Sequence, residues 1–358
     1  ANVGSYIQII QDCAARRQMK EIGEALIRKS GSMREEIDVV REDAAMKIRD
    51  VRASSGVPLV NQKDAVMMTY EKLGEAQSRE GKEKDRVMTG IRPLDRMTGG
   101  LYGSKLMIIG ARPSVGKSIF AMTICMNAAK QGKRVLYITR EMEVEELMER
   151  EMAAASLVSL SEITSGEITE KGWAGLASTL PELSGKKITY STQAWTVSDV
   201  RKAAFWMYEH EGIDLVCVDY IQLMDGSPNR KWSNRQEEVA DISRNLKRLA
   251  QELQIPVIAL SQLNRGSAKE KRPPTMNDAR ESGAIEQDAN IFLLLHDPEV
   301  DELKTEEMRR MAKNLNDNGM KLISVNVDKN RQGKKGMFHL AFDGAHMRFL
   351  PLTKEEQP

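Results

Sequence analysis

The residues best suited to chemistry form one short run, A-R-P-S-V-G-K-S, over Ala111–Ser118. An apolar, strand-like segment (Lys105–Gly110) precedes the run, and a helical pattern (Ile119–Ala129) follows it. In that context the N–H groups of a loop point inward around phosphates, and the positive end of the following helix adds to the attraction. The run therefore predicts a phosphate-binding loop for ATP, made of Arg112, Pro113, Ser114, Val115, Gly116, Lys117, Ser118 and Ile119.

Residue type assigns roles within this loop. Lys117 should reach the β- and γ-phosphates, and the Ser118 hydroxyl should hold Mg²⁺. Gly116 lets the backbone approach the phosphates closely. Ala111 stands where the strict pattern of such loops has its first glycine. We therefore expect the loop to keep its shape only if position 111 does not need a positive φ.

Three polar residues lie at or just after the ends of further strand-like segments. Asp219 is predicted to hold Mg²⁺, usually through water. Glu141 would orient and deprotonate the attacking water, because open α/β sheets bind ligands at the carboxyl ends of their strands. Its acid-rich surroundings are equally compatible with the start of a helix. Gln262 would sense the γ-phosphate.

The segments that position these residues alternate between strands and helices from about Gly90 onward. This order predicts an α/β fold with a mostly parallel, twisted sheet and helices on both faces. A helix is expected over Ser233–Leu253, with Ser233 and Gln236 as a capping box. The expected strands are Lys105–Gly110, Arg134–Thr139, Lys187–Thr192, Leu215–Tyr220, Pro256–Gln262, Ile291–His296 and Lys321–Asp328, followed by a hairpin of Met337–Ala341 and His346–Leu350.

The N-terminal part has a different pattern. Residues 1–55 are predicted to form a helical hairpin, and residues 56–88 a linker with one helix (Lys63–Arg79). Residues 89–358 are predicted to form one large α/β domain. In the linker helix Val66, Tyr70 and Leu73 form an apolar stripe. The stripe packs either within its own chain or on a neighbouring subunit, and the pattern leaves both readings open.

Composition limits the class of protein. Of 358 residues, 41% are hydrophobic and 29% charged, and no apolar run approaches the length of a membrane span. Three scattered cysteines without a CxxC motif argue against zinc, and Cys125 and Cys217 are expected to be buried thiols in a cytoplasmic protein. The net charge is only +1, so any nucleic-acid contact needs local basic clusters.

Three segments concentrate positive charge: Asp225–Gln236, which includes Arg235, then Asn264–Arg272, and Lys329–Lys335. Each follows a predicted strand. We expect all three at one edge of the sheet, where together they would face phosphates of single-stranded DNA.

Six motifs occur in one order along the chain: Thr89–Gly103 (TGIRPLDRMTGGLYG), Ala111–Ser118, Thr139–Met142 (TREM), Val218–Met224 (VDYIQLM), Ile258–Arg265 (IALSQLNR) and Asp278–Ala289 (DARESGAIEQDA). This series resembles the motif set of DnaB-family replicative DNA helicases. The resemblance covers roughly residues 60–350, and residues 1–55 resemble the helical hairpin that precedes the linker in that family. The globular part usually found before this hairpin is expected to be missing.

The resemblance implies a RecA-like core, a homohexameric ring and 5′-to-3′ movement along single-stranded DNA, with a primase and a helicase loader as partners. It assigns DNA contact to the segment with Arg280, Glu281 and Gly283. It places Lys329 and Arg331 across the subunit interface, where Arg331 would offset charge developing on the neighbour's γ-phosphate.

Two other functions share these features. A RecA-type recombinase, or another DNA-stimulated ATPase that does not unwind duplex, would have the same core. A nucleotide-gated scaffold would bind ATP without hydrolysing it, but the presence of both Glu141 and Asp219 argues against that reading.

Overall fold

The computed structural model describes residues 3–31, 37–53, 60–77, 86–226, 232–264, 272–279, 282–303 and 305–352. The chain divides into two compact units, Ala1–Arg79 and Glu80–Pro358, which are described separately. Across the described part of the chain, no helix is both long and apolar enough to cross a membrane.

The first unit is helical. Helices α1 (Val3–Ser30) and α2 (Ile37–Ala53) pack against each other, and Lys29 Nζ lies 3.0 Å from Asp43 Oδ2. Helix α3 (Gln62–Gln77) occupies most of the predicted linker helix. Its stripe residues Val66 and Tyr70 are exposed in this single chain. The side chain of Leu73 lies outside the described residues, so docking on a neighbouring subunit stays a prediction.

The second unit is built on a nine-stranded sheet of order β11-β10-β9-β8-β3-β7-β6-β4-β5. Strands β8 to β5 in this order run parallel, and β9, β10 and β11 run antiparallel to their neighbours. This confirms the predicted mostly parallel sheet. The strands are β3 (Leu106–Ala111), β4 (Val135–Thr139), β5 (Ile188–Ser191), β6 (Leu215–Asp219), β7 (Val257–Gln262), β8 (Ile291–His296), β9 (Met320–Asn330), β10 (Gly336–Asp343) and β11 (Arg348–Pro351). A separate pair joins β1 (Arg86–Val87) to β2 (Leu101–Tyr102).

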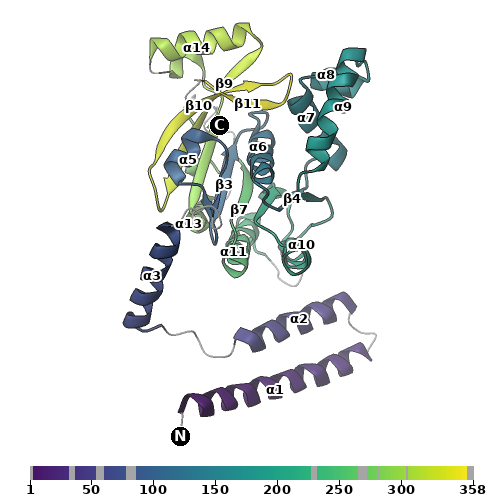
Figure 1. The fold of residues 1–358 in the computed structure, drawn as a ribbon, viewed down its shortest axis with the longest axis vertical. Coiled ribbons are helices and arrows are strands. Elements are labelled where there is room, and N and C mark those ends of the chain that lie inside the picture. Colours follow the sequence, from purple (N-terminus) through teal and green to yellow (C-terminus); the bar gives the residue numbers. More distant parts are fainter. Residues whose placement is uncertain are drawn as a thin grey trace. The chain divides into compact units, whose positions relative to one another are not determined.

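Both faces of the sheet are covered because its central strands are apolar on both sides. In β3, Met107 and Ile109 face the core under α6 (Lys117–Lys130), whereas Leu106 and Ile108 face the core under α10 (Val197–His210) and α11 (Arg235–Leu253). Figure 1 shows α6 and α11 flanking the sheet. Cys125 and Cys217 are buried, as predicted. The other helices are α5 (Arg92–Thr98), α7 (Val144–Ser156), α8 (Leu160–Ser165), α9 (Glu170–Ser184), α13 (Ser282–Asp288) and α14 (Glu306–Asp317), with short 3₁₀ turns η1 (Ile221–Leu223), η2 (Met276–Asp278) and η3 (Val300–Glu302).

The predicted capping box of the long helix is wrong by one residue. The helix α11 begins at Arg235, and its N-cap is Asn234, whose side chain accepts a hydrogen bond from Glu237 N at 2.9 Å. Asparagine and serine cap helices about equally well, so residue type alone does not decide which of the two neighbouring residues becomes the N-cap.

The expectation that all three basic segments share one sheet edge is also wrong. Strand β9 is antiparallel to β8, with Ile291 paired to Asn330 and His296 to Ser324. Residues after β9 therefore lie at the amino end of β8, opposite the edge reached by the ends of β6 and β7. The connecting helix α14 does not cross a face of the sheet; its Ala312 packs with Leu303 and Leu322 beside the start of β9 (Figure 1).

A buried carboxyl joins α7 to the sheet. Glu151 on α7 is 7% exposed and accepts a hydrogen bond from Tyr190 Oη on β5 at 3.0 Å. Burial raises the pKa of the Glu151 carboxyl from 4.5 to about 7, although the Tyr190 hydrogen bond and Lys186 oppose the shift. The native state thus holds this proton to higher pH than the unfolded chain does.

Replacing Glu151 with glutamine should stabilise the protein in a pH-dependent way. Below pH 4.5 the carboxyl is protonated in both states, so ionisation costs nothing. Between pH 4.5 and 7 the unfolded chain loses the proton first, and stability falls; above pH 7 the loss is complete, at about 3 kcal/mol. Urea unfolding of Glu151→Gln should therefore show most of its gain at pH 8 and little at pH 4.5.

The matched control is Glu145→Gln, at an exposed position on the same helix, which should not reproduce the gain at pH 8. Equal stabilisation by Glu151→Gln at both pH values would contradict the raised pKa.

Candidate nucleotide-binding site

The phosphate-binding loop starts from a fully extended residue. Ala111 is the last residue of β3, is 1% exposed, and pairs with Gln262 on β7 and Leu295 on β8. Its carbonyl accepts a hydrogen bond from Leu263 N at 3.0 Å. Ala111 has no positive φ. An alanine therefore meets the backbone requirement here, and the missing glycine does not disturb the loop.

Left-handed backbone occurs later in the loop, at Ser114 (φ 65°) and Gly116 (φ 92°). A side chain at Gly116 would also place its Cβ 3.2 Å from the ring of Phe349. Glycine is required at 116 for both reasons. The helix α6 begins at the next residue, Lys117, so its N–H groups face the loop.

The loop and two of the predicted catalytic residues line one cavity of about 220 Å³. Val115 is the exception among the predicted loop residues, because it is buried in the core. Met142 and Arg150 line the cavity but were not predicted to do so. Met142 belongs to the Thr139–Met142 motif, in which only Glu141 was given a role, and no motif covers Arg150 on α7. The lining residues are Ala111, Arg112, Pro113, Ser114, Gly116, Lys117, Ser118, Ile119, Glu141, Met142, Arg150 and Gln262.

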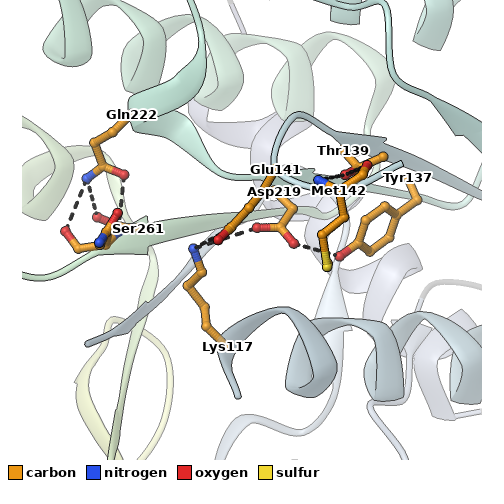
Figure 2. Close-up of polar contacts among 9 residues, drawn as sticks. Lys117, Tyr137, Thr139, Glu141, Met142, Asp219, Gln222 and Ser261 are labelled. Atoms are coloured by element: carbon orange, nitrogen blue, oxygen red, sulfur yellow. Dashed lines mark hydrogen bonds and ion pairs between the residues drawn. The ribbon is translucent and has the colours of Figure 1, made fainter. Parts of the chain in front are cut away.

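At the centre of the site an ammonium group lies between two carboxylates (Figure 2). Lys117 Nζ is 3.6 Å from Asp219 Oδ1 and 3.9 Å from Glu141 Oε2. It also lies 3.9 Å from the ring centroid of Tyr220. Burial lowers the pKa of Lys117, and the two carboxylates oppose that shift. The three side chains come from α6, β6 and the turn after β4, which only the parallel sheet brings together.

Asp219 is suited to hold a divalent cation. It is 0% exposed, and Tyr137 Oη donates to its Oδ2 at 3.1 Å. Its Oδ1 accepts no hydrogen bond from the residues that the structure describes. Within those residues no group of three or more His, Cys, Asp or Glu forms a metal site. Mg²⁺ in ATPases needs only one or two carboxylates beside the phosphates, so Asp219 and the Ser118 hydroxyl fit it.

The turn that carries Glu141 is fixed by its neighbours. Thr139 Oγ1 donates to Met142 O at 2.7 Å, and Met142 N donates back to Thr139 Oγ1 at 3.2 Å. Arg140 N donates to Asp219 O at 2.8 Å, and its guanidinium lies 3.3 Å from the centroid of the Trp195 ring. Burial raises the pKa of Glu141, and Asp219 adds to the effect while Lys117 opposes it. A raised pKa makes the carboxylate a stronger base.

The residues predicted to contact DNA are only partly described. Arg235 donates to the carbonyls of Gln222 and Met224 at 2.9 and 2.8 Å and pairs with Glu238, so its guanidinium is engaged within the chain. Gly283 is exposed on α13, with open space where a Cβ would lie. Arg280 and Glu281 lie outside the described residues, as do most of the basic residues in the first two segments.

Lys329 and Arg331 lie at the other edge of the sheet. Arg331 N donates to Asn290 O at 3.0 Å, and Asn290 Oδ1 accepts from Leu106 N, at the start of β3. The side chain of Arg331 donates to Gln287 O, and that of Lys329 to Glu286 O. The phosphate-binding loop leaves the opposite end of β3, roughly 16 Å away for five strand residues. Neither cation is in reach of the phosphate site of its own chain.

Comparisons with known proteins identify the family of this chain. A family model described as the DnaB-like helicase C terminal domain matches residues 86–351. The replicative DNA helicase DnaB of Geobacillus stearothermophilus is 34% identical over 359 residues, covering 99% of this chain and 76% of the relative. That of Pasteurella multocida is 35% identical over 367 residues, covering 99% and 75%.

Two solved structures are similar as well. One, of a DnaB-like replicative helicase and its interactions with primase, has a TM-score of 0.77 at 25% identity, covering 97% of this chain and 78% of that one. The other, of an ATPase domain, has a TM-score of 0.68 at 28% identity, covering 82% of this chain and 99% of that one. Because the family model spans most of the chain and these relatives match nearly all of it, the chain belongs to the DnaB family of replicative DNA helicases and is an ATP-hydrolysing helicase.

Proposed function

We propose that this chain is one subunit of a homohexameric ring that uses ATP and Mg²⁺ to move 5′ to 3′ along single-stranded DNA and to unwind duplex at a fork. The observation that carries the proposal is the convergence of Lys117, Asp219, Glu141 and Gln262 on one phosphate-binding loop. A phosphate-binding site alone would serve many proteins, but a base, a cation ligand and a γ-phosphate contact together serve hydrolysis.

In the proposed reaction Lys117 and the loop N–H groups hold the β- and γ-phosphates. Ser118 and Asp219 hold Mg²⁺, which would supply positive charge to the β- and γ-phosphate oxygens. Glu141 orients the attacking water and accepts its proton. Gln262, at the end of β7, contacts the γ-phosphate.

A second cavity suits the nucleoside portion of ATP. It has a volume of about 310 Å³, shares Ile119 and Arg150 with the phosphate cavity, and is walled by apolar side chains such as Met122, Leu147 and Phe349. We assign the base and ribose to this cavity, because ligand pockets are mostly apolar with a few polar groups that fix orientation.

The position of Arg331 supports a role in trans. It cannot serve its own chain's phosphates from the opposite sheet edge, so a neighbouring subunit in the ring would receive it, with Lys329 beside it. A cation delivered in this way makes hydrolysis depend on the position of the neighbour. Arg280 and Gly283 would line the channel and contact DNA phosphates without reading bases, and Glu281 would orient Arg280. Arg235 belongs to a segment assigned to the same channel, and its own guanidinium is engaged within the chain by Gln222, Met224 and Glu238.

The partners are single-stranded DNA, other copies of this chain and a primase, the last because a similar DnaB-like replicative helicase was studied for its interactions with primase. The proposal also includes a helicase loader as a partner and a cytoplasmic location for the protein. The recombinase-like ATPase that the sequence left open does not agree with the family. An assay that follows ATP hydrolysis and strand separation of a forked duplex in parallel tests the proposed unwinding.

Replacing Glu141 with glutamine should preserve ATP affinity and abolish turnover, because glutamine keeps the shape and the hydrogen bonds but cannot accept a proton. The expected loss of the DNA-stimulated rate is on the order of 10²–10⁴-fold, and unwinding should fall with it. Single-turnover hydrolysis and equilibrium binding of a fluorescent ATP analogue measure the two quantities. Glu145→Gln, at an exposed position nearby, is the control. A loss of less than about threefold would assign the base elsewhere.

Mixed rings test Arg331. Chains carrying Arg331→Ala should be inactive alone, and so should chains carrying Lys117→Ala. Mixing the two should restore part of the ATPase activity, because an intact loop from the first chain meets an intact Arg331 from the second. If mixed rings form, as judged by native mass spectrometry, and no mixture exceeds its parents, Arg331 does not act on its neighbour's ATP.

A further inference from the structure

The side chain of Gln222 ties together the ends of two strands that have different tasks in the proposed function. Gln222 lies in η1, just after Asp219. Its Nε2 donates to Ser261 Oγ at 2.9 Å and to Gln262 O at 3.4 Å, and its Oε1 accepts from Gln262 N at 3.1 Å. Figure 2 shows this amide reaching across from the end of β6 to the end of β7. The side chain of Gln222 is thus bonded to both the N–H and the carbonyl of Gln262, the residue proposed to contact the γ-phosphate.

The backbone of the same turn is bonded onward to α11. Arg235 Nη2 donates to Gln222 O at 2.9 Å and to Met224 O at 2.8 Å. Arg235 also pairs with Glu238, whose Oε1 accepts from Gly226 N at 2.7 Å. The bonds therefore run without a break from Gln262 through Gln222 and Arg235 to Gly226.

This network ends at both flanks of residues 227–231. Gly226 precedes that segment and Trp232 follows it. A Cβ added at Gly226 would lie 2.5 Å from Trp232 Nε1 and 2.7 Å from Glu238 Cγ, so the two flanks are packed against each other. A displacement of the η1 turn would be transmitted to both flanks, because tightly packed groups held by charge-assisted hydrogen bonds have little room to absorb it.

We propose that Gln222 is a positioning residue that couples γ-phosphate contact at Gln262 to the flanks of the first basic segment, Asp225–Gln236. The inference rests on the proposed function, in which Gln262 contacts ATP and the basic segment faces DNA. Arg235 serves this coupling through its bonds to the η1 turn. If ATP binding strengthens DNA binding through this path, DNA strengthens ATP binding by the same factor.

The test measures that factor from both directions. One ratio compares the Kd of a fluorescent oligo(dT) strand without nucleotide with its Kd in a saturating non-hydrolysable ATP analogue. The other compares the Kd of the analogue without and with oligo(dT). Gln222→Met keeps the length of the side chain but removes all three hydrogen bonds to β7, so both ratios should fall at least threefold and by equal factors. A variant that was merely less stable would lower the active fraction and leave both ratios unchanged.

The chain offers a matched control at Gln131. Its Oε1 accepts from Met88 N at 3.1 Å and its Nε2 donates to Met88 O at 2.8 Å, so it makes the same two-bond amide contact with the backbone at the far end of α6. Gln131→Met should leave both ratios at the wild-type value. A fall as large as that of Gln222→Met would attribute the effect to general loss of order and overturn the proposal.

A second variant covers the case in which Gln222→Met does not fold. Gln222→Asn keeps the amide but is one methylene shorter and cannot span to Gln262, so it should lower both ratios in the same way. Unchanged ratios in a folded variant overturn the coupling role and leave the proposed function intact. If both Kd ratios of the wild-type protein equal one, ATP and DNA binding are not coupled, and the proposed function is overturned together with the inference.

Discussion

The site depends on one buried arrangement, the ammonium of Lys117 held between Asp219 and Glu141 at the carboxyl edge of a parallel sheet. Burial of this lysine lowers its pKa, and the two carboxylates oppose that shift. The carboxylates in turn would repel each other without the lysine. The three groups therefore stabilise one another, and under the proposed assignment a nucleotide and a cation would replace these contacts.

Much of this arrangement was predictable because local patterns determine it. An apolar strand followed by a loop with glycine and lysine, and acids at the ends of apolar strands, are readable in a single sequence, and parallel pairing then brings the strand ends together. The strands of the nine-stranded sheet agree with the prediction to within a few residues, whereas the short strands β1 and β2 were not predicted. The sequence left the backbone conformation of Ala111 undecided, because only the pairing of β3 with both neighbouring strands fixes its φ.

The predictions that were wrong or missing depend on how separate elements pack and pair, which residue patterns do not encode. The strand β9 follows a helix, as a parallel strand usually does, but α14 stays at the edge of the sheet and returns the chain in the opposite direction. Nothing in the periodicity of β9 distinguishes the two cases. Arg150 and Gln222 were missed for another reason: Arg150 lines the phosphate cavity from α7 and the side chain of Gln222 bonds to β7, and the sequence alone does not show such contacts between separate elements.

The reversal of β9 has a consequence for how the enzyme is regulated. Under the proposed assignment each chain carries two halves of different active sites, one at each sheet edge, and completes neither. Catalytic competence then belongs to the assembled ring and not to the polypeptide. A chain that is newly made, dissociated or bound in an incomplete ring would hold ATP without consuming it, so the direction of a single strand protects the nucleotide pool from idle subunits.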